Sequence, residues 1–541
     1  MVKFQKLLLF SLFLSSAFPQ SKPVDLCAPP PGSFPPSLPA KLLEGQGRVH
    51  FPITTSSPKA QEFFNQGIAQ MHSFWFNEAE RSFLQAAELD PQAPMPHWGI
   101  AMVANGDYRP SHQLEYFPAP RQKKPYEGAS LRALEGAQKA LKLSAVPQKA
   151  TPIEKLYIAA VAARRDPKSK EPDAEYIRGL RAILARYPSE VEAKTYLALH
   201  LMRGFATPDK TPRSGSLEAV ALLKELQVQA PDHPGVHHYV IHGLEGSSFT
   251  KDALPSCKRY AELVPNIPHA LHMPGHIYSQ TGRWNEAVAS FERAAENERG
   301  YIKADQLYGL AHHGHNLEYL ANSYGFLGEF EKAVGVARSL LALKENPREA
   351  AQVDNAYGPY RRGFFSLLST LIHFERWDDL LMEKTLSALN TPRERAWRHF
   401  GLGLAYAAKG EANAAKGEAR AMDAALRDFK LMTKKEPPPY FKVAREELKG
   451  HIALASNRLE AGLKTLQKAS LMERALRYSE PPEYPRPVLE SLGRAALRHG
   501  RLPMAESAFR EALVQFPESS HATAGLRETL RRARKPEAPG L

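Results

Sequence analysis

Histidines are concentrated between residues 237 and 276, and their spacing is suited to binding a metal ion. His238 and His242 stand at positions i and i+4, and so do His272 and His276. On a helix, side chains with this spacing project from one face, about one turn apart. Two neighbouring helices that each carry such a pair are therefore expected to bring four imidazoles to one patch.

The two histidine pairs are separated by a constant period. His272 follows His238 by 34 residues, and His276 follows His242 by 34 residues. In a solenoid of stacked helix pairs, equivalent residues of successive repeats line the same concave groove. The period therefore predicts that the pairs face one another across adjacent helices, with His269 and His315 beside them.

The chemistry expected of such a patch is coordination of a divalent transition metal, namely zinc, copper or iron. Imidazole nitrogen suits all three ions, at about 2.0–2.1 Å for zinc, and neighbouring helices lie about 8–10 Å apart. Glu245 and Glu318 fall on the same predicted face, as ligands or as partners that orient the imidazoles. The predicted ligands are His238, His242, His269, His272, His276 and His315. The alternative is a groove of hydrogen-bonded or protonated histidines without an ion.

The sequence does not decide the roles of three features near these histidines. His237 points away from His238 on a helix and is expected to be a supporting or an exposed residue. His312 and His313 stand where a helix should begin, as caps, loop residues or ligands. Pro274 either lies in the first turns of its helix with little effect or bends the helix and aims His272 and His276 at a common point.

Helix pairs with a recurrent pattern of small and aromatic residues extend over most of the chain. Residues 60–91 carry Gly67, Ala79, Phe83, Ala86 and Pro91 at fixed offsets, and an equivalent pattern recurs near the C-terminus. The best-fitting repeats are 60–91, 237–265, 269–296, 314–341 and 486–517. This pattern resembles the tetratricopeptide repeat (TPR). The sequence thus predicts an all-α helical solenoid of stacked antiparallel helix pairs with inserted loops at 105–130, 204–216 and 297–312.

The segments HHYVIHGLE (237–245) and HALHMPGHIY (269–278) also resemble a group of exported bacterial TPR proteins. That resemblance implies no particular reaction. The TPR resemblance does imply a groove that holds a protein or peptide partner.

The N-terminus has the features of a secretory signal. Lys3 and Lys6 precede the apolar run LLLFSLFL, which is too short to span a bilayer. We therefore expect a signal peptide at 1–20, a Pro-rich arm at 21–56 and the solenoid at 57–541. The protein is expected to be exported to the periplasm or secreted, with no membrane insertion of the mature form. Export permits a disulfide between Cys27 and Cys257, but the sequence does not show that they meet.

Composition narrows the choice of function. Hydrophobic residues make up 43% and charged residues 24% of the 541 residues, as in an ordinary globular protein. The net charge of +13 is scattered along the chain and accompanies no nucleic-acid-reading motif, so no nucleic-acid partner is expected. Three hypotheses remain: a metal-binding scaffold, a metal-dependent hydrolytic or redox enzyme that uses the same histidines, and a metal-free adaptor that holds a peptide in its groove.

Overall fold

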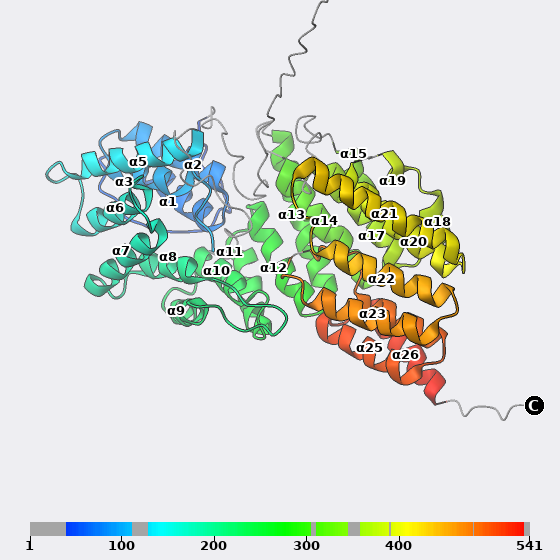
Figure 1. The fold of residues 1–541 in the computed structure, drawn as a ribbon. Coiled ribbons are helices and arrows are strands. Elements are labelled where there is room, and N and C mark those ends of the chain that lie inside the picture. The colour runs from blue at the N-terminus through cyan, green and yellow to red at the C-terminus, as the bar shows by residue number, and fades with distance from the viewer. Residues whose placement is uncertain are drawn as a thin grey trace, which may run out of the picture.

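The structure, a computed structural model, describes residues 39–110, 128–304, 310–343, 358–388, 391–479 and 481–534. Within these ranges the chain is built of helices, and the extended backbone makes only one isolated bridge, between Phe205 and Pro212. The helices stack in chain order, with α12 to α14 between the N-terminal and C-terminal halves (Figure 1). The predicted all-α solenoid of stacked helix pairs is confirmed. The predicted signal peptide, the first part of the Pro-rich arm and Cys27 lie outside the described residues.

The helices of the N-terminal half precede the histidine-rich α12. They are α1 (Pro58–His72), α2 (Phe76–Leu89), α3 (Pro94–Val103), α5 (Gly128–Ser144), α6 (Pro152–Arg165), α7 (Pro172–Arg186), α8 (Val191–Leu201), α9 (Ser216–Gln229), α10 (Pro234–Leu244), the 3₁₀ helix η1 (Thr250–Ala253) and α11 (Leu254–Leu263).

The remaining helices form the centre and the C-terminal half. They are α12 (Pro268–Gln280), α13 (Trp284–Ala304), α14 (Leu310–Leu327), α15 (Phe330–Ala342), α17 (Pro359–His373), α18 (Trp377–Met382), α19 (Thr385–Ala388), α20 (Pro392–Ala408), α21 (Ala412–Thr433), α22 (Tyr440–Ala455), α23 (Leu459–Arg474), α24 (Val488–Arg498), α25 (Leu502–Gln515) and α26 (Ser520–Ala533).

Each of the five ranges predicted to be repeats holds a packed helix pair. The pairs are α1 with α2, α10 with α11, α12 with α13, α14 with α15, and α24 with α25. Small residues allow the close approach, as the pattern suggested. A Cβ atom built on Gly67 falls 2.6 Å from the Phe83 ring, and one on Gly275 falls 2.4 Å from the Phe291 ring.

One of the three predicted inserted loops differs from expectation. Residues 297–312 were expected to interrupt the solenoid, but α13 continues to Ala304 and α14 begins at Leu310. The extra length is accommodated mainly as added helix, because Glu298 in this extension is fully buried against α14. Of the 105–130 insert, residues 111–127 lie outside the described residues, whereas 204–216 is a loop as expected.

The described part of the N-terminal arm packs on the solenoid. The Leu43 amide donates to Gln66 Oε1 at 2.7 Å, which ties the arm to α1. The Gln46 side chain donates to the Asn266 carbonyl at 2.7 Å, just before α12. Residues 39–56 therefore bridge two distant repeats and lie close to the start of the histidine-rich helix.

The turn inside a repeat requires a left-handed residue, which glycine adopts without strain. Glycines take this position at 282, 328, 410 and 500, and Asn457 takes it between α22 and α23. Two turns depart from this preference, with Phe74 at φ 52° and Glu375 at φ 53°. A left-handed conformation costs such residues about 1–2 kcal/mol, so their side chains must offset the strain.

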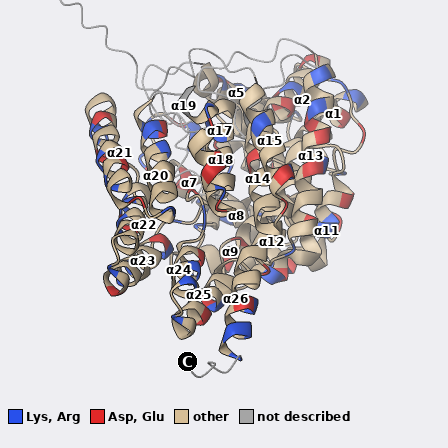
Figure 2. Cartoon of the chain, turned by 90° about the vertical axis from the view of Figure 1, so that its right-hand side faces the viewer, with Lys and Arg blue, Asp and Glu red and all other residues tan. Residues whose placement is uncertain are grey.

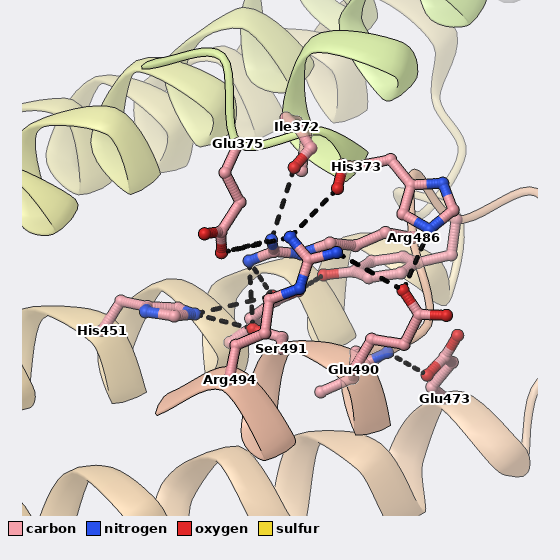
Figure 3. Close-up of polar contacts among 12 residues, drawn as sticks. Ile372, His373, Glu375, His451, Glu473, Arg486, Glu490, Ser491 and Arg494 are labelled. Carbon is pink, nitrogen blue, oxygen red and sulfur yellow. Dashed lines mark hydrogen bonds and ion pairs between the residues drawn. The ribbon is translucent and has the colours of Figure 1, made fainter. Parts of the chain in front are cut away.

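A buried polar network joins α17, α22, α23 and α24 (Figure 3). Arg486 donates to Glu447 Oε1 and to the Ile372 carbonyl, both at 3.3 Å. Glu375 accepts from Arg486 at 3.3 Å and pairs with Arg494 at 3.5 Å, so its side chain offsets the strain of its turn. The network fixes the C-terminal helices against the end of α17.

The surface carries charges of both signs. On the side drawn in Figure 2, positions of Lys and Arg are interspersed with positions of Asp and Glu along the helices. Among the described helices, none combines the length and the apolar character needed to cross a bilayer.

Candidate metal centre

Three successive helices position the predicted ligands. α10 carries His238 and His242, α12 carries His269, His272 and His276, and α14 carries His315. Proline at the first position of α10 and of α12 favours helix initiation there. Pro274 is the seventh residue of α12, at the end of its second turn, and the helix runs on to Gln280.

The first cluster, called the first triad, consists of His238, His242 and His269. One ligand atom of each lies within 4.8 Å of the others. The Nε2 atoms of His238 and His269 are 3.2 Å apart. Two nitrogens bound to a tetrahedral ion at about 2.0–2.1 Å would be separated by about 3.3 Å. The spacing of this pair therefore fits a tetrahedral or trigonal ion with little adjustment.

The second cluster, called the second triad, consists of His272, His276 and His315. Its ligand atoms also lie within 4.8 Å of one another. The Nε2 atoms of His272 and His276 are 2.8 Å apart. At ordinary metal–nitrogen distances this separation subtends about 85–90° at an ion, which a five-coordinate or octahedral ion accommodates.

The six predicted ligands thus form two triads, whereas the sequence predicted convergence on one patch. The triads are neighbours, because the rings of His269 and His272 are 6.2 Å apart between centroids. His312 lies between them, 5.6 Å from the His269 ring and 5.4 Å from the His272 ring.

Hydrogen bonds at Nδ1 orient the rings of the first triad. His238 Nδ1 lies 2.5 Å from the His72 carbonyl, which can only accept, so this nitrogen carries the proton. His242 Nδ1 donates to Glu245 Oε2 at 3.2 Å. His269 Nδ1 lies 3.4 Å from His312 Nε2. Both His238 and His242 therefore leave Nε2 as a lone pair, the form that binds a metal.

The second triad is oriented in the same way. His276 Nδ1 donates to Glu245 Oε1 at 2.6 Å. His272 Nδ1 lies 2.8 Å from Asn316 Oδ1, and the Asn316 amide nitrogen donates to the Phe291 carbonyl at 2.8 Å, which sets the orientation of the amide. His272 and His276 consequently present two Nε2 lone pairs to each other. His315 Nδ1 is buried and has no hydrogen-bond partner among the described residues.

Electrostatics favour neutral imidazoles and a charged carboxylate. Burial, reinforced by neighbouring histidines, holds the pKa values of the buried rings well below 6.5; these are His238, His269, His272 and His315. Burial alone would raise the pKa of Glu245, but His276 and His242 outweigh it and keep that pKa well below its usual value. This combination is the one that a metal requires of its ligands.

The two predicted supporting carboxylates differ. Glu245 accepts one Nδ1 proton from each triad and is therefore shared between them. Glu318 instead forms an ion pair with Arg362 on α17. The tyrosine Tyr478, from the segment between α23 and α24, donates to Glu245 Oε1 at 3.2 Å and accepts from Gln280 at 2.5 Å.

The sequence did not predict a third cluster, formed by His72, Glu192 and His233, because these residues come from two helices and the N-cap of a third, all far apart in the chain. It is satisfied without an ion. His233 Nδ1 accepts from the Val236 amide at 3.3 Å, so Nε2 carries the proton and donates to Glu192 at 2.9 Å. His72 bonds Glu192 at 2.8 Å and the Tyr239 hydroxyl at 2.9 Å. The cluster is a structural network of hydrogen bonds.

The remaining histidines near the site have supporting roles. His237 is buried, contacts Ser256 and the Pro231 carbonyl, and faces neither triad. His312 and His313 lie within α14, and both donate from Nδ1 to the buried Glu298. Neither is a loop residue. His312 stands three residues before His315 on α14, and this spacing is the sequence signal by which its place on the same face could have been recognised.

The chain itself covers part of the groove. Pro481, Pro482 and Pro485 border a shallow hollow between α14 and α17, and the Ser369 hydroxyl donates to the Pro485 carbonyl at 3.1 Å. Its other lining residues include Glu318, Asn322 and Thr370. An extended segment of this chain thus lies where a bound peptide was expected.

Comparisons with known proteins bear on the repeat. Residues 270–300, which include most of α12 and α13, match the tetratricopeptide repeat. Among solved structures, yeast Tom70 is similar, with 11% identity over 89% of this chain and 97% of that chain and a TM-score of 0.35. A tetratricopeptide repeat protein from Parabacteroides merdae ATCC 43184 shows 13% identity over 63% of this chain and 99% of that chain, with a TM-score of 0.31. No curated protein matches the sequence. The central helix pair is therefore similar to a tetratricopeptide repeat.

Proposed function

We propose that this protein is an exported metal-binding scaffold in which each histidine triad holds one transition-metal ion. The observation that carries the proposal is the close approach of Nε2 atoms, between His238 and His269 and between His272 and His276, in rings where Nδ1 of His238, His272 and His276 is already hydrogen-bonded. Imidazole ligands suit zinc, copper and iron, and at each site the ion would join two solenoid helices. The N-terminal signal supports export.

The ion-free alternative is costly at the second triad. His272 Nε2 and His276 Nε2 are 2.8 Å apart, and the acceptors at both Nδ1 atoms require protons there. A hydrogen bond between the two rings therefore needs one of them to be a charged imidazolium, which burial opposes. A bound cation removes this conflict because it uses both lone pairs.

A metal-free peptide adaptor has less support. The hollow between α14 and α17 is bordered by the chain's own Pro481, Pro482 and Pro485. A protein or peptide partner of the solenoid remains part of the proposal, at surfaces other than this covered part of the groove.

Elemental analysis of protein purified from metal-replete medium tests the proposal. We expect two ions per chain in the wild type and loss of both in the double variant His238→Ala, His272→Ala. His237→Ala is the matched control, because His237 neighbours His238 yet its ring nitrogens bond Ser256 and the Pro231 carbonyl. Circular dichroism checks that each variant is folded. Metal-free wild type, or full metal content in the double variant, contradicts the proposal.

A further inference from the structure

Phe74 occupies a turn position where the other described repeats favour glycine or asparagine. Its φ of 52° lies in the left-handed region, which a bulky aromatic residue rarely adopts. Strain of this kind persists where the surrounding structure requires the side chain, and it is concentrated at functional sites. The contacts of the Phe74 ring therefore indicate why the turn is not glycine.

The Phe74 ring covers the first triad. Its centroid lies 4.5 Å from that of His238, 5.3 Å from that of His242 and 5.6 Å from that of His269. The ring is only 1% exposed, and His238 is fully buried. One apolar side chain thus packs against all three imidazoles.

We propose that Phe74 makes the first triad a site for copper(I), bound by three imidazoles alone, in preference to zinc and other divalent ions. This inference rests on the proposed metal-binding function. It assigns the second triad, whose His315 is only partly buried, to the divalent ion.

Coordination number is the first reason. Zinc in proteins is almost always four-coordinate, and a three-histidine zinc site completes its shell with water. Copper(I) is a closed-shell ion that is stable with three nitrogen donors in a plane. On this proposal the Phe74 ring, packed against all three imidazoles, takes the place of a fourth ligand, which disfavours zinc and is compatible with copper(I).

Charge is the second reason. The first triad offers three neutral donors and no carboxylate ligand, and the cost of burying an ion rises with the square of its charge. Two charged groups of opposite sign lie nearby: the Arg109 guanidinium, 5.1 Å from the centre of the Phe74 ring, and the Glu245 carboxylate, which accepts from His242 Nδ1 at 3.2 Å. Because these charges oppose each other, the dependence of the burial cost on the square of the ionic charge favours the monovalent ion.

The test isolates the first triad in a His272→Ala background and titrates it, without oxygen, with copper(I) and separately with zinc against chelators of known affinity. We expect copper(I) to bind one per chain and zinc to bind weakly. Phe74→Gly, which suits the left-handed turn, should strengthen zinc binding by about tenfold or more as water gains access. Phe74→Leu should retain the preference for copper(I), because it keeps an apolar side chain at the site.

Controls separate this inference from the function on which it rests. Asn457→Gly changes the same turn in a distant repeat and should alter neither affinity. Zinc binding that is as tight in the wild-type triad as in Phe74→Gly overturns the copper(I) assignment while leaving metal binding intact. Failure of both ions to bind the folded His272→Ala protein and its Phe74 variants overturns the proposed function as well.

Discussion

Replacement of Glu245 by glutamine is expected to weaken metal binding at both triads simultaneously. The Glu245 carboxylate accepts Nδ1–H from His242 at 3.2 Å and from His276 at 2.6 Å. Glutamine keeps the shape of the side chain but offers one acceptor oxygen and one NH₂ group. One of the two imidazoles must then face a donor, and the other loses a charged acceptor.

The size of the effect follows from these contacts. Loss of a partner that orients a ligating histidine typically lowers metal affinity by about 10–100-fold, or about 1.4–2.7 kcal/mol. His276 has the shorter bond to Glu245, so we expect the larger loss at the second triad. The first triad should weaken less, because His238 keeps its bond to the His72 carbonyl at 2.5 Å.

The assay measures each triad alone by chelator competition, with the other triad removed by His238→Ala or His272→Ala. Glu490→Gln is the matched control. Glu490 is a buried carboxylate that accepts from His373 Nε2 at 2.9 Å in the C-terminal network (Figure 3). The Glu490→Gln substitution therefore changes a similar carboxylate–histidine pair that belongs to neither triad. If Glu245→Gln weakens only one triad, or neither, then Glu245 is not the shared partner that we infer.

Two further predictions concern groups outside the triads. Glu192→Gln should lower the free energy of unfolding by about 1.5–3 kcal/mol, because His72 and His233 both bond the carboxylate. Chemical denaturation measures this loss. An accompanying loss of bound metal would contradict the structural role of this cluster. Glu473→Gln should stabilise the protein at alkaline pH: burial raises the pKa of Glu473 to about 8, so the folded state holds a proton that the unfolded state releases near 4.5. The stability from this proton is present in full below 4.5 and is lost as pH rises towards 8, by at most about 1.4 kcal/mol per unit. Thermal unfolding should therefore show a gain for Glu473→Gln at pH 8.5 and little change at pH 4.5, and equal effects at both pH values would refute the assignment.

The sequence predicted which histidines form the candidate site but not how they group. The 34-residue period suggested that His238 meets its equivalent, His272. In the structure His238 instead lies 3.2 Å from His269, and Glu245 bonds His276, so each contact joins residues 31 apart. The stacked helices are thus displaced by nearly one turn, which the period alone does not reveal. This displacement splits the predicted patch into two triads.

Residues from distant parts of the chain were not predictable by spacing. His72, Glu192 and His233 meet because several repeats curve around one another, and no local pattern connects them. The predicted break at 297–312 failed for a related reason. Glu298 is buried by His312 and His313 of α14, so the tertiary contact favours continuation of α13 over a loop.

Two residues with an unfavourable left-handed backbone, Phe74 and Glu375, lie beside the buried polar clusters of this fold. Glycine or asparagine is the unstrained choice at the turn inside a repeat, yet Phe74 and Glu375 adopt the same left-handed conformation. Glu375 contacts three arginines of the C-terminal network, and Phe74 contacts all three rings of the first triad. A strain of about 1–2 kcal/mol at each turn is tolerated because the side chain completes a buried cluster. Glycine would form either turn more easily, so the aromatic ring at 74 is retained for its contacts, which are with the three histidines and with the surrounding core at Phe76 and Tyr239.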